Sequence, residues 1–145
     1  MPAWVDAGYE EYARRMSRTL PLRLVQVKPE PRAEGAPVAR STEAEAKRID
    51  AGLPAGSVKV VLDERGRACT TRELAERISA WQMEGRDVAF VIGGADGTSP
   101  ALRAGADWLW SLSPLTLPHG LARVVVAEQL YRASTILSNH PYHRE

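Results

Sequence analysis

Hydrophobic positions recur with two different spacings along the chain. Spacings of three and four residues, typical of helices with one buried face, predict helices at residues 2–16, 41–53 and 70–85. A longer apolar segment predicts a helix at residues 119–137, and a further helix is predicted to start at residue 99. Alternating or continuous apolar runs predict strands at residues 22–27, 57–62 and 87–94, and a fourth strand that begins at Trp108 and becomes a loop before Pro118. The Pro-rich segment 28–37 is predicted to be a loop, and residues 63–70 a turn.

Local signals define where two of these helices begin. Thr70 is followed three residues later by Glu73, the spacing of a capping box. Ser99 precedes Pro100, which combines a preferred N-cap residue with a preferred first-turn residue.

Strands that alternate with helices predict an α/β fold with a mostly parallel sheet. The second and third predicted strands are continuously apolar, as expected when both faces of a sheet are covered. The last helix, residues 119–137, is apolar on several sides, and we therefore expect two buried faces and a subunit interface there.

Composition narrows the class of protein. A chain of 145 residues is expected to form a single domain. A net charge of +1 gives no global signature for nucleic acid, so any RNA contact must be local. The candidates are two arginine clusters, one around the first helix and one around a loop: Arg14, Arg15, Arg18 and Arg23, and Arg65, Arg67 and Arg72. Cys69 is the only cysteine, which suits a reducing compartment. No apolar run is long enough to span a membrane, and the first residues include acids, so we expect a cytoplasmic protein without membrane association.

Two strand ends carry candidate ligand-binding features. Gly93 and Gly94 follow the third strand, and they either form a simple turn or let the backbone approach a ligand beside the helix that starts at Ser99. Residues 111–120 alternate leucines with hydroxyl side chains and contain two prolines. Such a loop is either a buried crossing or a surface that offers main-chain groups to a ligand such as an adenine ring.

The chain ends with a dense group of polar side chains, "NHPYHRE". The spacing of His140 and His143 around Pro141 is poor for metal ligation, and no metal site is predicted. Glu128 and Arg132 stand at i, i+4 on the last helix, which is consistent either with a modest surface pair or with a positioning role. His119, at the start of that helix, is expected to orient or cap rather than act as a base.

Three segments, "MPAW", "EGRDVAFVIGGADG" and "SLSPLTLPHGLARVVVAEQLYRASTILSNHPYHRE", resemble the RlmH family of bacterial methyltransferases. The resemblance implies one SPOUT domain over residues 1–145, an α/β-knot fold with a C-terminal trefoil knot, and a homodimer. It implies S-adenosylmethionine as cofactor and a pseudouridine of 23S ribosomal RNA, in the loop of helix 69 of the assembled ribosome, as substrate; no DNA partner is implied.

The family's site carries over residue by residue. The implied cofactor contacts are the second strand's last residue, the first glycine after the third strand and the apolar loop, that is, Leu62, Gly93, Leu112, Ser113, Pro114, Leu115, Thr116 and Leu117. The chemistry is methyl transfer to ring nitrogen N3, which must lose a weakly acidic proton. We expect His143 to take that proton directly or through water, Arg144 to bond a carbonyl oxygen or a phosphate, and Tyr142 to stack on or bond the base.

Three expectations remain open at this stage. The family begins with a strand before the Met-Pro-x-Trp segment, so a misplaced start codon or a truncation is expected upstream of Met1. One alternative function is a catalytically weak ribosome-binding or assembly protein with the same fold. The other is a knotted methyltransferase that acts on a different RNA such as tRNA.

Overall fold

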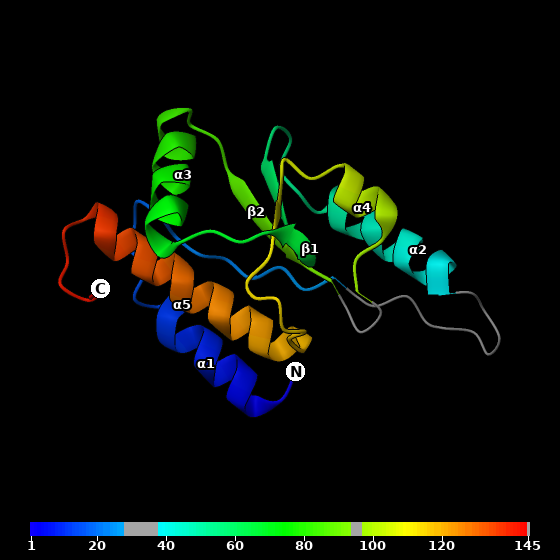
Figure 1. The fold of residues 1–145 in the computed structure, drawn as a ribbon, viewed down its shortest axis with the longest axis horizontal. Helices are drawn as coiled ribbons and strands as arrows, with labels where there is room; N and C mark the ends of the chain where they lie inside the picture. Colours follow the sequence, from blue (N-terminus) through cyan, green and yellow to red (C-terminus); the bar gives the residue numbers. More distant parts are fainter. Residues whose placement is uncertain (28–37, 94–96, 145) are drawn as a thin grey trace. The chain divides into compact units, whose positions relative to one another are not determined.

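The computed structural model describes residues 1–27, 38–93 and 97–144. Its helices and strands alternate along most of the chain (Figure 1), in the order α1 (Ala3–Ala13), α2 (Val38–Ala51), β1 (Val58–Arg67), α3 (Thr71–Met83), β2 (Val88–Ile92), α4 (Pro100–Ala104), β3 (Trp108–Trp110) and α5 (His119–Leu137). The predicted loop at 28–37 lies outside the described residues.

The strands form one parallel sheet in the order β2-β1-β3. The central strand, β1, is fully buried at both Val60 and Val61, whose side chains point to opposite faces because successive residues of a strand alternate. The prediction of a parallel α/β sheet with covered central strands is therefore confirmed.

One strand prediction and part of one turn prediction are wrong. Residues 22–27 form no strand, and Leu24 and Val25 are exposed, because no segment in the described part of the chain pairs with them. The turn predicted at residues 63–70 is also incorrect at its start, since β1 continues to Arg67 with an irregular register between Leu62 and Arg67. A Cβ at Gly66 would overlap the carbonyl oxygen of Leu109, so only glycine lets the two backbones come this close.

The predicted helix signals are confirmed. Thr70 and Glu73 form a reciprocal capping box at α3, Gly85 follows that helix with φ +70°, and the Ser99 side chain accepts a hydrogen bond from the amide of Leu102 at the start of α4. Helix α5 begins and ends at the predicted residues, 119 and 137.

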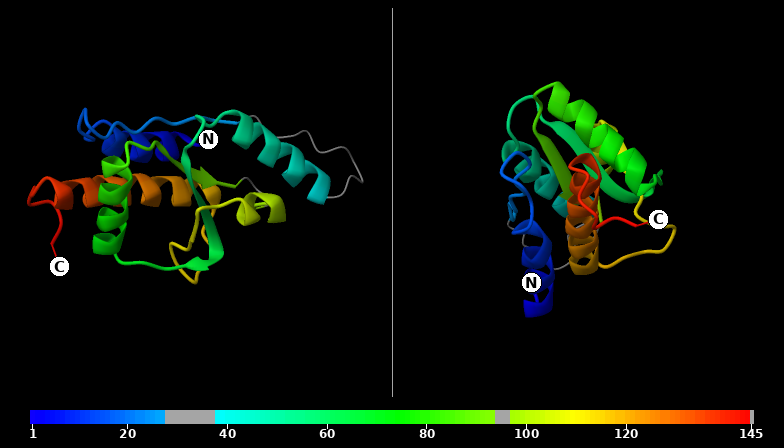
Figure 2. Two further views of the ribbon diagram at one scale, coloured as in Figure 1. Left: turned by 90° about the horizontal axis from the view of Figure 1, so that it is seen from above. Right: turned by 90° about the vertical axis from the view of Figure 1, so that its left-hand side faces the viewer.

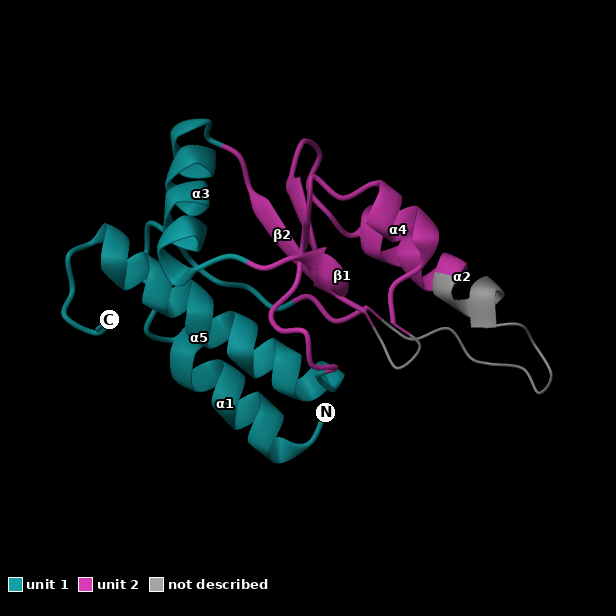
Figure 3. Cartoon of the chain, in the orientation of Figure 1, with its two compact units in different colours: residues 1–24, 69–85, 117–145 teal, residues 25–68, 86–116 magenta. Residues whose placement is uncertain are grey.

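The chain divides into two compact units (Figure 3). The first comprises residues 1–24, 69–85 and 117–145, and the second comprises residues 25–68 and 86–116. The second unit contains the sheet, α2 and α4, around a core of apolar side chains from each of them: Ala46, Ile49, Val61, Val91 and Leu102.

In the first unit, α5 packs against both α1 and α3, and α1 runs beside it (Figures 1 and 2). Helices α1 and α3 therefore account for the burial of α5 on two sides. The buried residues of α5 include Val126, Leu130 and Ala133. The two buried faces of α5 are therefore not in themselves a sign of a subunit interface. No helix in the described ranges has the length and hydrophobicity needed to cross a membrane.

Candidate active site

The three strands bring the predicted cofactor residues of the sheet to one edge. In the parallel register Leu62 lies between Ile92 of β2 and Trp110 of β3. The segments that follow, starting at Gly93 and Ser111, consequently leave the sheet at the same carboxyl edge. In open α/β folds this edge is where ligands bind.

Gly93 is sterically required where it stands. A Cβ at this position would lie 2.7 Å from the carbonyl oxygen of Gly97, closer than real side chains approach, and Gly97 itself has φ +78°. The backbone around Gly93 is therefore closely packed, which favours the interpretation as a specialised loop over a generic glycine turn.

The loop at residues 111–116 is organised by its own hydroxyl groups. Ser111 Oγ donates to the carbonyl oxygen of Ser113 at 2.9 Å, and Ser113 Oγ accepts from the amide of Leu115 at the same distance. Leu115 is 72% exposed, although it is a large apolar side chain. The interpretation as a buried crossing therefore does not hold for Leu115, whereas an apolar surface for a ligand agrees with it.

Two acids on β1, which the sequence analysis did not select, hold these two loops. Thr98 Oγ1 donates to Asp63 Oδ2 at 2.6 Å, and Thr116 Oγ1 donates to Glu64 Oε2 at 2.6 Å. Two acids directly after a buried strand could have indicated this role. They were not selected because residues 63–70 were predicted to be a turn.

The pKa of the Asp63 carboxyl is lowered. Burial alone would raise it, but the hydrogen bond from Thr98, the bond from the Arg65 amide at 2.8 Å, and the guanidinium groups of Arg65 and Arg103 together favour the ionised form. Asp63 is therefore a fixed negative charge beside the predicted cofactor loop.

The C-terminal tail leaves α5 through a defined helix cap. The amide of His140 donates to the carbonyl oxygen of Thr135 at 2.9 Å, and the amide of Asn139 donates to the carbonyl oxygen of Ile136 at 3.3 Å. Asn139 has φ +59°, so these bonds form a Schellman motif with asparagine in the left-handed position. The amide of Tyr142 then donates to Nδ1 of His140 at 3.2 Å. The direction of the tail is consequently set by the helix cap and by this bond to the His140 side chain.

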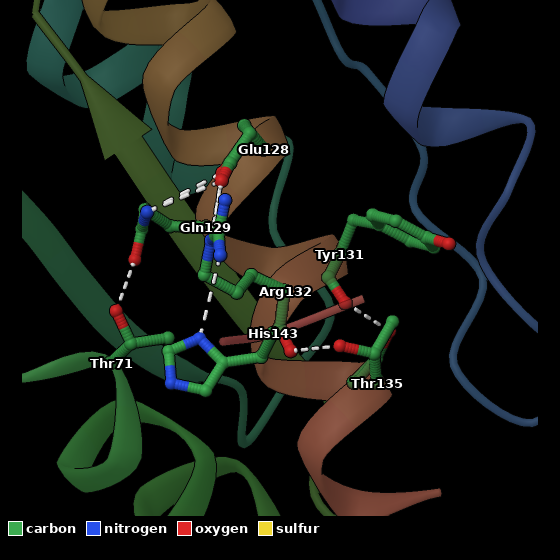
Figure 4. A network of polar contacts seen from close by, with 8 residues as sticks. Thr71, Glu128, Gln129, Tyr131, Arg132, Thr135 and His143 are labelled. Carbon is green, nitrogen blue, oxygen red and sulfur yellow. Dashed lines mark hydrogen bonds and ion pairs between the residues drawn. The ribbon is translucent and has the colours of Figure 1, made fainter. Parts of the chain in front are cut away.

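Arg132 of α5 connects the tail to the helix. Its Cζ lies 4.8 Å from the centroid of the Tyr142 ring. Its Nη1 lies 3.4 Å from Nδ1 of His143 (Figure 4). Tyr142 also meets Tyr131 edge-to-face, with 4.7 Å between ring centroids. Two of the three predicted catalytic side chains, Tyr142 and His143, thus pack against α5, while Arg144 is exposed.

A network of polar side chains fixes Arg132 in turn. Glu128 accepts from Nε of Arg132 at 2.7 Å, and Gln129 Nε2 lies 3.4 Å from the Glu128 carboxylate (Figure 4). The hydroxyl of Thr71, in the first turn of α3, donates to Gln129 Oε1 at 2.8 Å. The Glu128–Arg132 pair is only 17% and 27% exposed, so it is not a freely solvated surface pair, and the positioning interpretation is the better supported one. Gln129 and Thr71 were missed because their contact joins residues 58 positions apart.

Two groups in this cluster have a raised pKa. The hydrogen bond to Glu128 raises the pKa of Arg132, so its guanidinium stays charged. Burial, followed by the charge of Glu128, raises the pKa of the Tyr142 phenol, so Tyr142 keeps its proton at neutral pH. Because a guanidinium can only donate, Nδ1 of His143 is the acceptor in its contact with Arg132, and in the neutral ring the proton resides on Nε2.

The other candidates lie elsewhere in the structure. Pro118 is the N-cap residue of α5. Nε2 of His119 lies 3.2 Å from Nη2 of Arg123. Arg14 and Arg15 both pair with Glu11, whose pKa is lowered chiefly by the Arg14 hydrogen bond, so much of their charge is balanced. In the described ranges no three His, Cys, Asp or Glu side chains gather as a metal site would need.

The two groups of predicted site residues belong to different units. Leu62, Gly93 and residues 112–116 lie in the unit with the sheet. Leu117, Tyr142, His143 and Arg144 lie in the unit with α5.

A parallel sheet with glycine and apolar loops at its carboxyl edge defines an α/β protein with a candidate binding site at the strand ends. Residues 1–143 match the family described as "Predicted SPOUT methyltransferase". The chain is 54% identical over 144 residues to the ribosomal RNA large subunit methyltransferase H of Burkholderia multivorans, covering 99% of this chain and 92% of that protein. The protein of the same name from Ralstonia pickettii shows the same identity and coverage. The chain belongs to the RlmH family of SPOUT methyltransferases.

Proposed function

We propose that this protein methylates ring nitrogen N3 of a pseudouridine in 23S ribosomal RNA, in the helix 69 loop of the assembled ribosome. The relatives' names specify large-subunit ribosomal RNA. The main structural support is the contact of Arg132 with both Tyr142 and His143. This contact holds two hydrogen-bonding side chains of the tail in defined positions.

The sheet edge has the features that S-adenosylmethionine needs. Gly93 lets main-chain groups approach a ligand closely, and the exposed Leu115 offers apolar surface for an adenine ring. We infer that Leu62, Gly93 and residues 112–117 hold this cofactor, whose sulfonium supplies the methyl group. The cofactor also explains why a loop between buried segments displays a leucine.

The chemistry requires removal of the N3 proton and stabilisation of the negative charge that develops on the imide. Methyl transfer forms the N3–carbon bond and breaks the carbon–sulfur bond, while the N3 proton passes to a base. Tyr142, which keeps its phenol proton, is a hydrogen-bond donor or a stacking surface for the base. Arg144 is exposed and serves a carbonyl oxygen or a phosphate of the substrate.

The contact of His143 with Arg132 determines which of two roles His143 can take, a hydrogen-bond donor or a base. While Nδ1 accepts from Arg132, the ring presents Nε2–H and donates to an imide carbonyl oxygen. To act as the base, His143 takes up a proton at Nδ1 after parting from Arg132. The pH dependence of methyl transfer in the His143→Asn variant distinguishes these roles, because only loss of a base removes an acid limb from the profile.

The same proposal includes a homodimer with a C-terminal trefoil knot, acting in the cytoplasm on ribosomes. Exposed apolar side chains on α1 and α5, Trp4 at 57% and Leu121 at 38%, support a second copy as a partner of this unit. Sedimentation of the purified protein tests the dimer independently of catalysis.

The direct test is methylation of purified ribosomes with labelled S-adenosylmethionine, followed by nucleoside mass spectrometry of the 23S RNA. We expect one 3-methylpseudouridine per ribosome. Cofactor binding without methyl transfer would favour the alternative of a ribosome-binding or assembly protein. Label found only in tRNA would favour the alternative of a tRNA methyltransferase.

A further inference from the structure

The extension of β1 beyond Leu62 has no explanation in the proposed cofactor contacts. It carries Asp63 and Glu64, and each accepts a hydrogen bond from a threonine in one of the two loops that leave the sheet edge. One strand thereby contacts both the β2–α4 loop and the loop after β3.

The two contacts differ in burial. The Asp63 side chain is only 7% exposed, while Glu64 and Thr116 are both exposed. A hydrogen bond between exposed groups competes with water and contributes little, whereas a buried carboxylate that loses its donor is left with an unsatisfied charge. The Asp63 contact is therefore the stronger of the two.

The Asp63 contact also extends to α4. Nη1 of Arg103 donates to the carbonyl oxygen of Thr98, lies 3.3 Å from the Thr98 hydroxyl oxygen and lies 3.9 Å from Oδ2 of Asp63. The hydroxyl of Thr98 consequently donates to Asp63 while it accepts from Arg103. This arrangement fixes both the hydroxyl and the backbone of Thr98, directly after Gly97, which packs against Gly93.

We propose that Asp63 is a positioning residue for cofactor binding: through Thr98 it holds the backbone of Gly97 beside Gly93. The inference rests on the proposed function, because Gly93 is taken to contact S-adenosylmethionine. Asp63 does not touch the reacting atoms in this account. Glu64 acts on Thr116 in the same way but with a smaller effect.

The variants are chosen to keep the fold. Thr98→Val removes the hydroxyl but keeps the shape, Thr98→Ser restores the hydroxyl, and Asp63→Asn removes the charge. Asp107→Asn is the matched control, because Asp107 accepts from the Lys59 amide at 2.7 Å at the opposite, amino end of β1 and β3. Glu64→Gln tests the predicted ranking.

Two readouts separate this proposal from the proposed function. Calorimetry with S-adenosylhomocysteine should show affinity reduced roughly tenfold or more in Thr98→Val and Asp63→Asn, the size expected for a hydrogen bond to a charged group, with little change in Thr98→Ser and Asp107→Asn. The KM for ribosomes should stay constant. Amide hydrogen exchange of the ligand-free protein should show faster exchange at residues 98–103 in Thr98→Val but not in Thr98→Ser.

Equal exchange and equal affinity in Thr98→Val and Thr98→Ser would overturn the role of Asp63. A wild-type protein that binds no S-adenosylhomocysteine would instead contradict the proposed function. The exchange comparison would in that case still decide whether Asp63 orders the loop.

Discussion

The guanidinium of Arg132 lies over the ring of Tyr142, 4.8 Å from its centroid, while its Nη1 reaches His143. One side chain of α5 thus contacts two successive residues of the tail. Glu128 accepts a hydrogen bond from Nε of the same guanidinium at 2.7 Å, which restricts the orientation of Arg132.

Replacing Arg132 by Gln should reduce kcat for methyl transfer about a hundredfold, since misplacement of a reacting group by about 1 Å has an effect of this size. Affinity for S-adenosylmethionine should remain unchanged, because the cofactor candidates of the sheet edge do not include Arg132. Single-turnover kinetics and calorimetry measure the two quantities separately. Arg77→Gln on the exposed face of α3 is the control, and equal losses in both variants would contradict a specific role.

The left-handed conformation of Asn139 gives a second prediction. Asn139→Ala should lower the free energy of unfolding by about 1 kcal/mol, because a Cβ disfavours φ near +60° and alanine lacks the local hydrogen bonds of asparagine. Asn139→Gly should be tolerated. Urea unfolding checks the difference, and Ala and Gly variants of equal stability would show that the Schellman motif does not hold the tail.

The residues around the tail show how far sequence reasoning extends. Helix α5 was predicted over residues 119–137 because this segment is long and apolar on several sides and follows a proline. The Arg132–His143 and Thr71–Gln129 contacts could not be predicted, because each depends on how separate segments meet in space. Residues 22–27 have the composition of a strand, but strand formation needs a hydrogen-bonding partner, and none is found within the described ranges.

Gly93→Ala should weaken cofactor binding by tenfold or more and destabilise the fold by about 1–3 kcal/mol, the typical cost of forcing an extra methyl group into a packed site. The added Cβ would lie 2.7 Å from the Gly97 carbonyl oxygen. Gly52→Ala is the control, since the nearest atom to its Cβ would be 3.5 Å away. Calorimetry and thermal unfolding provide the measurements; a Gly93→Ala protein with native affinity would remove Gly93 from the site.

Acidification should weaken the fold partly through Asp63. The pKa of this carboxyl is lower in the folded protein than in the unfolded chain, where it is about 3.9. Its contribution to stability is therefore complete above the unfolded pKa and is lost as the pH falls through the lowered folded value. The Asp63→Asn variant should lose less stability between pH 6 and pH 3 than the wild type, as followed by urea unfolding at each pH. Parallel losses in the two proteins would mean that Asp63 does not stabilise the fold through its charge.

The central claim is that the anchored tail completes a methyltransferase that acts on 23S ribosomal RNA. The most direct measurement is nucleoside mass spectrometry of 23S RNA from cells that lack the gene and carry either the full chain or a chain without residues 142–145. We expect 3-methylpseudouridine with the full chain and none with the shortened chain, although the shortened protein remains folded by thermal unfolding. Full modification by the shortened protein, or no modification by the complete one, would contradict the account.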